Sequence, residues 1–274
     1  MTDQYAVIGN PIAHSKSPMI HEAFARQTGQ DMRYERILAS LDGFEATIRE
    51  LIKQGYKGVN VTVPFKFEAF VLADARTARA MDAGAANTLI FNEQGIVADN
   101  TDGAGIVRDI EKNLQLPLAG KRVLLLGAGG AAEGVLHPIL ACKPSLLTIV
   151  NRSMDKALAM VKKAEATKAL SVTTLSGCEF NDLPGQEFDV VINATSAGLT
   201  DTALPIPNTI FAKGCLAYDM MYGRETPFMQ QARTNGAIVA DGLGMLIEQA
   251  AEAFYVWRGV RPETKPVIEM VSAL

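Results

Sequence analysis

Lys66 and Asp102 have the side-chain types that a proton relay needs, and each follows a segment with polar residues beside an apolar strand pattern. Lys66 follows Asn60-Val61-Thr62-Val63-Pro64-Phe65, and Asp102 follows Asp99-Asn100-Thr101. A partly buried lysine beside a carboxylate can give a proton to the alkoxide that forms when hydride adds to a ketone, and can take one in the reverse direction. An isolated lysine is nearly always a solvated charge, so this prediction requires Asp102 to lie beside Lys66.

The segment His14-Ser15-Lys16-Ser17-Pro18 contains a second group of candidate binding residues. Pro18 suits the opening position of a helix, which would bring the hydroxyls of Ser15 and Ser17 close to backbone donors that can bind a carboxylate. Serine before proline is also a common helix N-cap, so these residues alone support a binding role and a structural role equally.

A glycine-rich segment, Gly127-Ala128-Gly129-Gly130-Ala131-Ala132, follows an apolar strand pattern and precedes a helical one. Gly127 permits a tight turn, Gly129 lets the backbone approach a pyrophosphate, and Ala132 stands where the helix packs close to the sheet. The helix N-terminus would then bind phosphate. An isolated match would as often be an ordinary turn, but this strand and helix context favours a dinucleotide site.

The residues after the next strand indicate which dinucleotide binds. A cofactor without a 2′-phosphate calls for Asp or Glu there, whereas this chain has Asn151-Arg152-Ser153. A guanidinium can bind a 2′-phosphate through two hydrogen bonds and stack on the adenine. The sequence therefore predicts NADP, although an arginine at a helix start is elsewhere often only solvated.

Other chemistries have little support. The three cysteines lack Cys-x-x-Cys spacing, which argues against a disulfide framework or structural zinc. The histidines, His14, His21 and His137, show neither a nucleophile setting nor a zinc helix motif. We therefore expect no metal and no Ser-His-Asp catalysis.

Charge and hydrophobicity argue against two classes of partner. The net charge is −4 and the basic residues are dispersed, which is unlike a nucleic-acid-binding surface. No basic region leads into an apolar stretch at the N-terminus, and no apolar window is long enough to cross a bilayer. We expect a cytoplasmic protein that is neither exported nor anchored.

The elements that must position these residues form two α/β series. The first has expected strands at 5–8, 33–37, 58–61 and 87–91 and helices near 18–27, 44–54 and 75–83. A helix at 104–113 leads into Leu116-Pro117-Leu118-Ala119-Gly120, which suits a connector. The second series has expected strands at 122–126, 147–150, 190–193, 216–219 and 237–240 with helices between most of them, and a further helix at 245–257.

This order predicts an α/β fold with two lobes and a cleft between them. The N-terminal α/β substrate lobe would comprise residues 1–102, completed by C-terminal helices at about 245–274. A Rossmann-like, doubly wound parallel sheet that binds NADP would comprise residues 103–244.

The sequence resembles the shikimate dehydrogenase family over nearly its whole length. The motifs that carry the resemblance are 10–18 (NPIAHSKSP), 60–66 (NVTVPFK), 84–88 (GAANT), 100–103 (NTDG), 127–131 (GAGGA), 151–153 (NRS), 193–198 (NATSAG), 219–222 (DMMY) and 241–245 (DGLGM). The resemblance implies reversible NADPH-dependent reduction of 3-dehydroshikimate to shikimate in the chorismate route to aromatic amino acids.

The resemblance also implies residue roles. Lys66 and Asp102 would be the catalytic pair, and Ser15 and Ser17 would bind the substrate carboxylate. Further contacts to the substrate hydroxyls and carboxylate would come from Thr62, Asn87, Tyr222 and Gln249. The cofactor would be bound by Gly127, Ala128, Gly129, Gly130, Ala131, Asn151, Arg152, Ser153 and Lys156, with Met220 and Gly244 lining the nicotinamide pocket.

This chain departs from the family pattern at three positions. Ser153 stands where threonine is frequent and keeps the hydroxyl, while Lys156 stands where arginine is frequent and loses the two-pronged donor. Phe67 replaces a frequent acidic residue, and no physical reason for that change is evident.

Two alternative functions remain open at this point. One is a quinate/shikimate dehydrogenase of broader specificity that prefers NAD, against which Arg152 argues. The other is a non-catalytic NADP-binding sensor module, which would have no need of Lys66, Asp102 and the paired serines. The sequence does not decide between a monomer and a homodimer.

Overall fold

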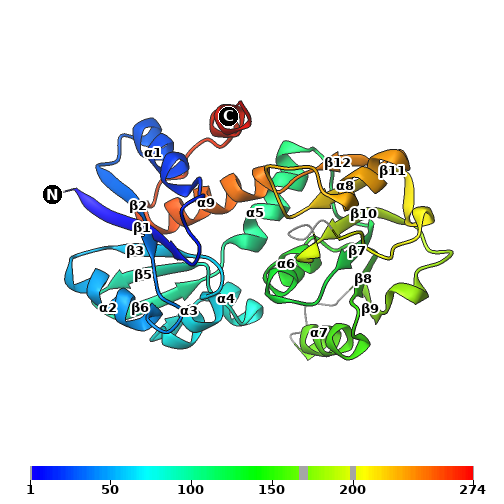
Figure 1. The fold of residues 1–274 in the computed structure, drawn as a ribbon, viewed down its shortest axis with the longest axis horizontal. Coiled ribbons are helices and arrows are strands. Elements are labelled where there is room, and N and C mark those ends of the chain that lie inside the picture. The colour runs from blue at the N-terminus through cyan, green and yellow to red at the C-terminus, as the bar shows by residue number, and fades with distance from the viewer. Residues whose placement is uncertain (1, 167–171, 198–201, 274) are drawn as a thin grey trace. The chain divides into compact units, whose positions relative to one another are not determined.

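The computed structural model describes residues 2–166, 172–197 and 202–273. The chain divides into two compact units (Figure 1). Unit 1 comprises Met1–Gly105 and Leu246–Leu274, and unit 2 comprises Ile106–Met245. Among the described residues, no helix combines the length and the apolar character needed to span a bilayer.

Unit 1 contains a six-stranded sheet in the order β2-β1-β3-β5-β6-β4. Its strands are β1 (Asp3–Gly9), β2 (Met32–Leu38), β3 (Gly58–Val61), β4 (Ala75–Arg76), β5 (Thr88–Asn92) and β6 (Gly95–Asp99). Strand β5 runs antiparallel to both neighbours, whereas the other pairs are parallel. The helices are α1 (Ser17–Thr28), α2 (Phe44–Lys53), α3 (Lys66–Leu72), α4 (Ala78–Ala83) and α10 (Lys265–Ser272).

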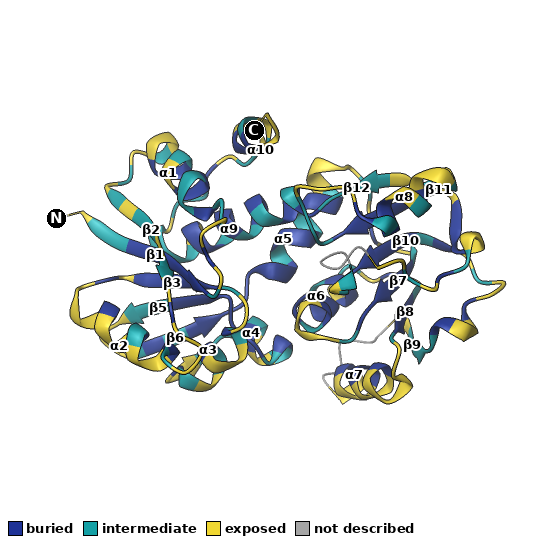
Figure 2. Ribbon diagram, in the orientation of Figure 1, coloured by how far each residue is buried: buried dark blue, intermediate teal, exposed yellow. Residues whose placement is uncertain are grey.

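Helices cover both faces of this sheet (Figure 1). One face packs apolar side chains of β1 and β3, including Ile8 and Val61, against Ile48 of α2 and Phe65 at the start of α3. The other face carries an aromatic cluster of side chains from β1, β2, α1 and α9 (Leu243–Arg258). Its members are Tyr5, His21, Phe24, Tyr34, Phe254 and Trp257. Figure 2 shows the buried strands inside exposed helix surfaces.

The sequence prediction of one helix at 75–83 is wrong for its first three residues. Ala75 and Arg76 pair with β6 as strand β4, and the Thr77 side chain accepts a hydrogen bond from the Ala80 backbone N–H to begin α4. Threonine is a favoured N-cap, so the helix starts after it. The short helix α3 and strand β6 were not predicted from the sequence.

Unit 2 contains a six-stranded, wholly parallel sheet in the order β12-β11-β10-β7-β8-β9. Its strands are β7 (Arg122–Leu126), β8 (Leu146–Val150), β9 (Thr174–Cys178), β10 (Phe188–Asn193), β11 (Phe211–Asp219) and β12 (Ile238–Ala240). If the strands are numbered 1 to 6 in chain order, the sheet runs 3-2-1-4-5-6 from β9 to β12. This strand order is that of the dinucleotide-binding Rossmann fold. The predicted doubly wound sheet is confirmed. Strand β9 was not predicted, and β11 begins at Phe211 rather than at Leu216.

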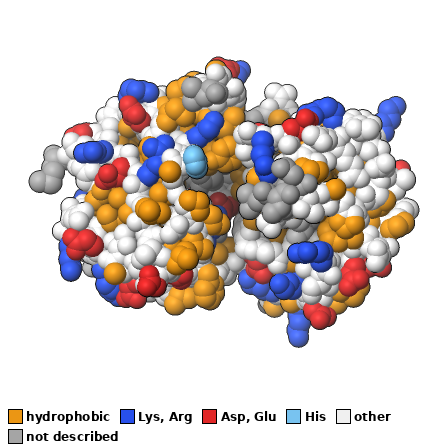
Figure 3. Space-filling view, viewed as in Figure 1, with side chains coloured by type: hydrophobic (Ala, Val, Ile, Leu, Met, Phe, Trp, Pro, Cys, Tyr) orange, Lys and Arg blue, Asp and Glu red, His pale blue; other side chains and the backbone are white. Residues whose placement is uncertain are grey.

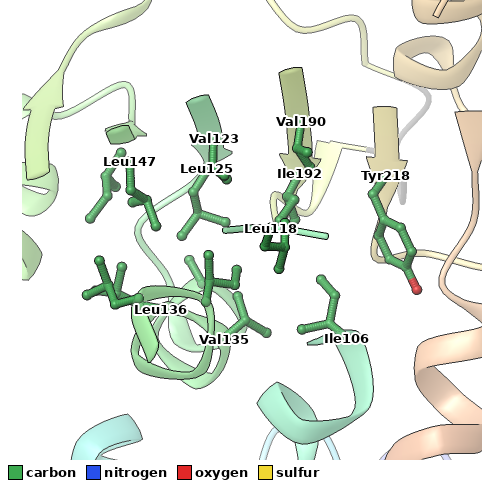
Figure 4. Packing of buried hydrophobic residues seen from close by; sticks show 14 of the residues in the cluster. Ile106, Leu118, Val123, Leu125, Val135, Leu136, Leu147, Val190, Ile192 and Tyr218 are labelled. Atoms are coloured by element: carbon green, nitrogen blue, oxygen red, sulfur yellow. The ribbon is translucent and has the colours of Figure 1, made fainter. Parts of the chain in front are cut away.

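Successive side chains of β7 point to opposite faces of this sheet, and both faces are covered by helices. Val123 and Leu125 point into the cluster that contains α6 (Gly130–Ala141) and α7 (Met154–Ala166), as Figure 4 shows for α6. Leu124 and Leu126 point into the opposite cluster with α8 (Pro227–Thr234). All four are fully buried, and each contributes about 2 kcal/mol through removal from water.

Helix α5 (Asp102–Arg108) continues as a π-helical turn, Asp109–Asn113, where the sequence predicted one regular helix from 104 to 113. Asp109 is buried there and accepts hydrogen bonds from the Tyr218 hydroxyl at 2.7 Å and from Asn113 Nδ2 at 2.9 Å.

Charged side chains of both signs are interspersed over the face seen in Figure 3, and no broad basic patch covers it.

Candidate active site

Lys66 is positioned by the turn that joins β3 to α3. Strand β3 ends at Val61, Thr62-Val63-Pro64 reverses the chain, and the fully buried Phe65 anchors the start of α3 in the unit 1 core. The Lys66 carbonyl accepts a hydrogen bond of 2.9 Å from the Ala86 backbone N–H. This bond holds the first residue of α3 against the segment that leads to Asn87.

The ammonium of Lys66 forms an ion pair with Asp102. Lys66 Nζ donates to Asp102 Oδ2 at 2.5 Å, although the residues are 36 positions apart. The side chains are 30% and 11% exposed, so the pair is partly shielded yet reachable from solvent. Asp102 Oδ1 accepts a bond of 2.8 Å from Asn87 Nδ2, which leaves the carboxylate bonded on both oxygens.

Asn87 is the hub of a buried polar network around this pair. Thr101 Oγ1 at 2.9 Å and Gln249 Oε1 at 3.1 Å also lie within hydrogen-bonding distance of Asn87 Nδ2, so its two N–H donors face three acceptors. Asn87 Oδ1 accepts from the Thr101 backbone N–H at 2.9 Å, which helps to fix the amide plane and orient Nδ2 toward Asp102. The structure thus brings together Lys66, Asp102, Asn87 and Gln249, four of the predicted site residues.

Asn60 and Tyr34 extend the network, and sequence reasoning assigned neither a role. Asn60 Nδ2 donates to Thr88 Oγ1 at 3.0 Å and to the Asn87 carbonyl at 3.2 Å, and Asn60 Oδ1 accepts from the Tyr34 hydroxyl at 2.7 Å. A signal was available for Asn60, because an asparagine within the buried strand Gly58–Val61 needs polar partners.

Ser15 and Ser17 form a separate pair at the N-terminus of α1. Ser15 Oγ donates to Ser17 Oγ at 3.2 Å and accepts from the Ser17 backbone N–H at 3.3 Å. Tyr34, whose hydroxyl donates to Asn60, also lies near this pair. Burial raises the pKa of the Tyr34 hydroxyl well above its usual value, and the neighbouring Ser17 side chain partly offsets this rise.

Thr62 lies beside Gly9 at the ends of β3 and β1. A Cβ at Gly9 would fall 2.5 Å from Thr62 Cγ2, so glycine is needed for this close approach. Thr62 is half-buried, and its backbone N–H donates to the Ile8 carbonyl at 2.9 Å.

The glycine-rich segment of unit 2 lies where the strand order reverses. Gly127 has φ +108°, a conformation that favours glycine, and a Cβ there would lie 3.2 Å from the Ala194 carbonyl oxygen at the end of β10. Within the described part of the chain, the backbone N–H groups of residues 128–132 donate no hydrogen bond. Gly129, Gly130 and Ala131 are exposed. Free donors at the N-terminus of α6 fit the pyrophosphate of a dinucleotide.

Asn151, Arg152, Ser153 and Lys156 surround the start of α7. Asn151 Nδ2 donates to the Ser153 carbonyl at 3.1 Å and so closes the turn after β8. Arg152 and Lys156 are exposed, and neither forms an ion pair with any residue that the structure describes. Two exposed cations without ion-pair partners at the N-terminus of α7 fit a 2′-phosphate.

Met220 and Gly244 are both held closely within unit 2. The Met220 backbone N–H donates to the Asn193 carbonyl at 3.0 Å, and Met220 packs against the main core cluster. A Cβ at Gly244 would fall 2.0 Å from Asp109 Oδ1, which restricts this position to glycine. Tyr222 also belongs to unit 2, whereas the other predicted substrate contacts belong to unit 1. Burial raises the pKa of the Tyr222 hydroxyl.

A buried carboxylate that sequence reasoning left without a role organises the ends of β10 and β11. Asp219 is fully buried, and it accepts from Thr226 Oγ1 at 2.6 Å, Asn193 Nδ2 at 3.0 Å and the Met221 backbone N–H at 3.0 Å. Asn193 Oδ1 in turn accepts from Thr195 Oγ1 at 2.7 Å. Gly198, the last residue of the motif that starts at Asn193, lies outside the described residues.

Three family models match successive parts of the chain. The shikimate dehydrogenase substrate binding domain matches residues 7–89, the shikimate / quinate 5-dehydrogenase model matches residues 109–200, and the shikimate 5'-dehydrogenase C-terminal domain matches residues 242–270.

Similar curated proteins and solved structures extend over almost the whole chain. The protein named shikimate dehydrogenase (NADP(+)) from Methylobacillus flagellatus is 60% identical over 272 residues, covering 99% of both chains. The protein of the same name from Dechloromonas aromatica is 58% identical and covers 100% of this chain and 98% of its own. The crystal structure of an Ael1 enzyme from Pseudomonas putida is 51% identical with a TM-score of 0.93, covering 98% of both chains. The structure of shikimate 5-dehydrogenase from Thermus thermophilus in complex with NADP(H) and shikimate is 29% identical with a TM-score of 0.85, also covering 98% of both chains.

Proposed function

This chain belongs to the shikimate dehydrogenase family, and from that premise we propose that it catalyses the reversible reduction of 3-dehydroshikimate to shikimate by NADPH. The observation that carries the proposal is the ion pair between Lys66 and Asp102 at 2.5 Å. A ketone reductase needs one group that can hold and release a proton at the carbonyl oxygen, and this pair provides it.

Unit 1 provides the groups that would bind the substrate. Ser15 and Ser17 carry adjacent hydroxyls at the α1 N-terminus, a suitable partner for the ring carboxylate. Asn87 and Gln249 lie next to the catalytic pair and would bind ring hydroxyls. Thr62 at the end of β3, and Tyr222 from unit 2, would complete the hydroxyl and carboxylate contacts.

Unit 2 provides the groups that would bind NADP. The unpaired backbone N–H groups of residues 128–132 would hold the pyrophosphate. Asn151, Arg152, Ser153 and Lys156 would bind the adenosine ribose with its 2′-phosphate, and Met220 and Gly244 would border the nicotinamide. Because Arg152 and Lys156 are cationic and exposed, a 2′-phosphate is favoured over a bare ribose hydroxyl.

In the reduction, NADPH supplies the hydride that adds to the substrate carbonyl carbon. Lys66 Nζ gives its proton to the carbonyl oxygen as negative charge develops there. Asp102 holds the ammonium in place through Oδ2, and Asn87 holds Asp102 through Oδ1. In the oxidation of shikimate, neutral Lys66 takes the hydroxyl proton. Asp102 stabilises the ammonium that results, so it acts on the lysine in both directions.

Spectrophotometry of the purified chain tests substrate, cofactor and activity together. We expect NADPH absorbance to rise when NADP and shikimate are added, and to rise far less with NAD in place of NADP or quinate in place of shikimate. Equal rates with quinate and NAD would favour a quinate/shikimate dehydrogenase of broader specificity. Tight NADP binding without turnover of either substrate would favour a sensor module and refute the proposal.

We also propose that the enzyme works in the cytoplasm. Cys142, Cys178 and Cys215 carry free thiols, which suits a reducing compartment.

A further inference from the structure

Arg36 on strand β2 contacts the segment proposed to bind the substrate carboxylate. Arg36 Nε donates to the Ser15 carbonyl oxygen at 2.8 Å, and Arg36 Nη2 donates to the same oxygen at 2.6 Å. Ser15 is thereby tied to β2, and Ser17 is tied to Ser15 through the bond between their hydroxyls.

The alternation of β2 explains why Arg36 reaches this segment. Tyr34 and Arg36 are two residues apart, so their side chains leave the same face of the strand. Glu35 leaves the opposite face, where it accepts a hydrogen bond from Tyr56. Arg33 shares the face of Glu35 and is exposed. The strand therefore offers one arginine that contacts the serine segment and one that does not.

Arg36 has hydrogen-bonding capacity and charge that its protein contacts leave unused. A guanidinium has five N–H donors, and the structure uses two of these on Ser15. No carboxylate pairs with Arg36 among the residues that the structure describes, and the side chain is exposed. The two serine hydroxyls are neutral, so they supply hydrogen bonds to an anion but no compensating charge.

Lys16 lies within the segment 15–17 and is the other cation that could attract a bound carboxylate. Lys16 is the N-cap residue of α1, and its side chain caps nothing. Its ammonium forms no hydrogen bond or ion pair with any described residue, so no such bond fixes it toward the serine hydroxyls. Arg36 differs because two hydrogen bonds fix its guanidinium plane at Ser15.

We infer that Arg36 is a specificity residue for this enzyme, holding the Ser15 backbone in place and supplying the positive charge that selects a ring carboxylate. The inference rests on the proposed function, because it assumes that Ser15 and Ser17 bind that carboxylate. It predicts preference for an anionic substrate over a neutral one of the same shape, with little influence on the chemical step.

Shikimate carries a carboxylate, whereas its methyl ester is neutral. Kinetics with both substrates therefore separate recognition of the negative charge from other effects of a substitution. Arg36→Gln should raise KM for shikimate about tenfold, with kcat within about twofold of the wild-type value. The same variant should change kcat/KM for the neutral methyl ester by no more than about twofold. Arg36→Lys keeps the charge and loses the two-pronged bond to Ser15, so its KM for shikimate should rise by only about threefold.

Arg33→Gln and Lys16→Gln are the matched controls, and both should leave the shikimate-to-ester ratio of kcat/KM unchanged. The inference is overturned if Arg36→Gln loses as much activity on the ester as on shikimate, because that pattern indicates only a structural role. It is also overturned if Lys16→Gln, and not Arg36→Gln, lowers the ratio. Absence of shikimate turnover by the wild-type chain would refute the proposed function itself, whereas normal wild-type turnover with an unaltered Arg36→Gln variant would refute the inference alone.

Discussion

Replacement of Lys66 by methionine tests the proton relay directly, because methionine keeps an apolar stem of similar length and removes the ammonium. Proton transfer by a positioned side chain accelerates reactions by about 10²–10⁴-fold, which corresponds to about 3–5 kcal/mol of transition-state stabilisation. We therefore expect kcat for shikimate oxidation to fall by about 10²–10⁴-fold.

The contacts around Lys66 predict that KM and stability change much less. Asp102 still accepts a hydrogen bond from Asn87 after the substitution, and Asn87 keeps its bonds to Thr101 and Gln249. We expect KM for shikimate to stay within about threefold. The Lys66 side chain is 30% exposed but Asp102 is buried, so the substitution leaves a buried carboxylate without its counter-charge and should lower the free energy of unfolding by about 1–3 kcal/mol.

Steady-state NADPH absorbance, measured over a range of shikimate concentrations, gives kcat and KM, and chemical denaturation gives the free energy of unfolding. Lys57→Met is the matched control, since Lys57 is exposed just before β3 and should leave both kinetic parameters unchanged. In a Lys66→Ala variant, an added primary amine should restore part of kcat, because the side chain is reachable from solvent. Comparable changes in kcat and KM, or a variant with wild-type kcat, would refute the assignment of Lys66 as the proton donor.

Three further predictions concern the cofactor, a buried hydroxyl and a buried histidine. Arg152→Ala should reduce the preference for NADP over NAD by about tenfold in kcat/KM, because the 2′-phosphate loses a charge-assisted hydrogen bond. Thr226→Val should lower the free energy of unfolding by about 2–4 kcal/mol, since the buried hydroxyl caps α8 and donates to Asp219. Burial lowers the pKa of His21 to about 3 from an ordinary value of 6.5, so the unfolded chain binds a proton that the folded chain refuses. His21 should therefore remove about 1.4 kcal/mol of stability for each pH unit below 6.5, down to about pH 3, and His21→Leu should abolish that part of the slope.

Each of these predictions has a control and a result that contradicts it. Lys162 is an exposed residue of α7, and Lys162→Ala should leave the NADP-to-NAD ratio of kcat/KM unchanged. A wild-type ratio in the Arg152→Ala variant would argue against phosphate binding by Arg152. Thr234→Val at the exposed end of α8 should change stability by about 0.5 kcal/mol or less, and an equal loss at both threonines would exclude a special role for the Asp219 bond. For His21, chemical denaturation at a series of pH values measures the free energy of unfolding. If this free energy falls equally steeply with decreasing pH in the wild type and in His21→Leu, the prediction for His21 is wrong.

Local pattern was sufficient to predict much of the fold and part of the site. The apolar run 122–126, the glycines after it and the arginine at 152 are each recognisable within a few residues, and the predicted strand and the tight turn at Gly127 agree with the structure. Short or interrupted elements escaped prediction. Strand β4 and helix α4 were merged into one helix, because their boundary depends on pairing with β6, a strand twenty residues further along the chain.

Sequence by itself determined which side chains were available for chemistry: a lysine, an aspartate, paired serines and a glycine-rich turn, each recognisable from its type and its immediate neighbours. Tertiary structure alone decided which of them meet. Lys66 reaches Asp102 across 36 positions, Asn87 reaches Gln249 across 162, and Arg36 reaches Ser15 from another element. These contacts depend on strand order and helix packing, and such long-range terms leave no trace in the periodicity of any single segment.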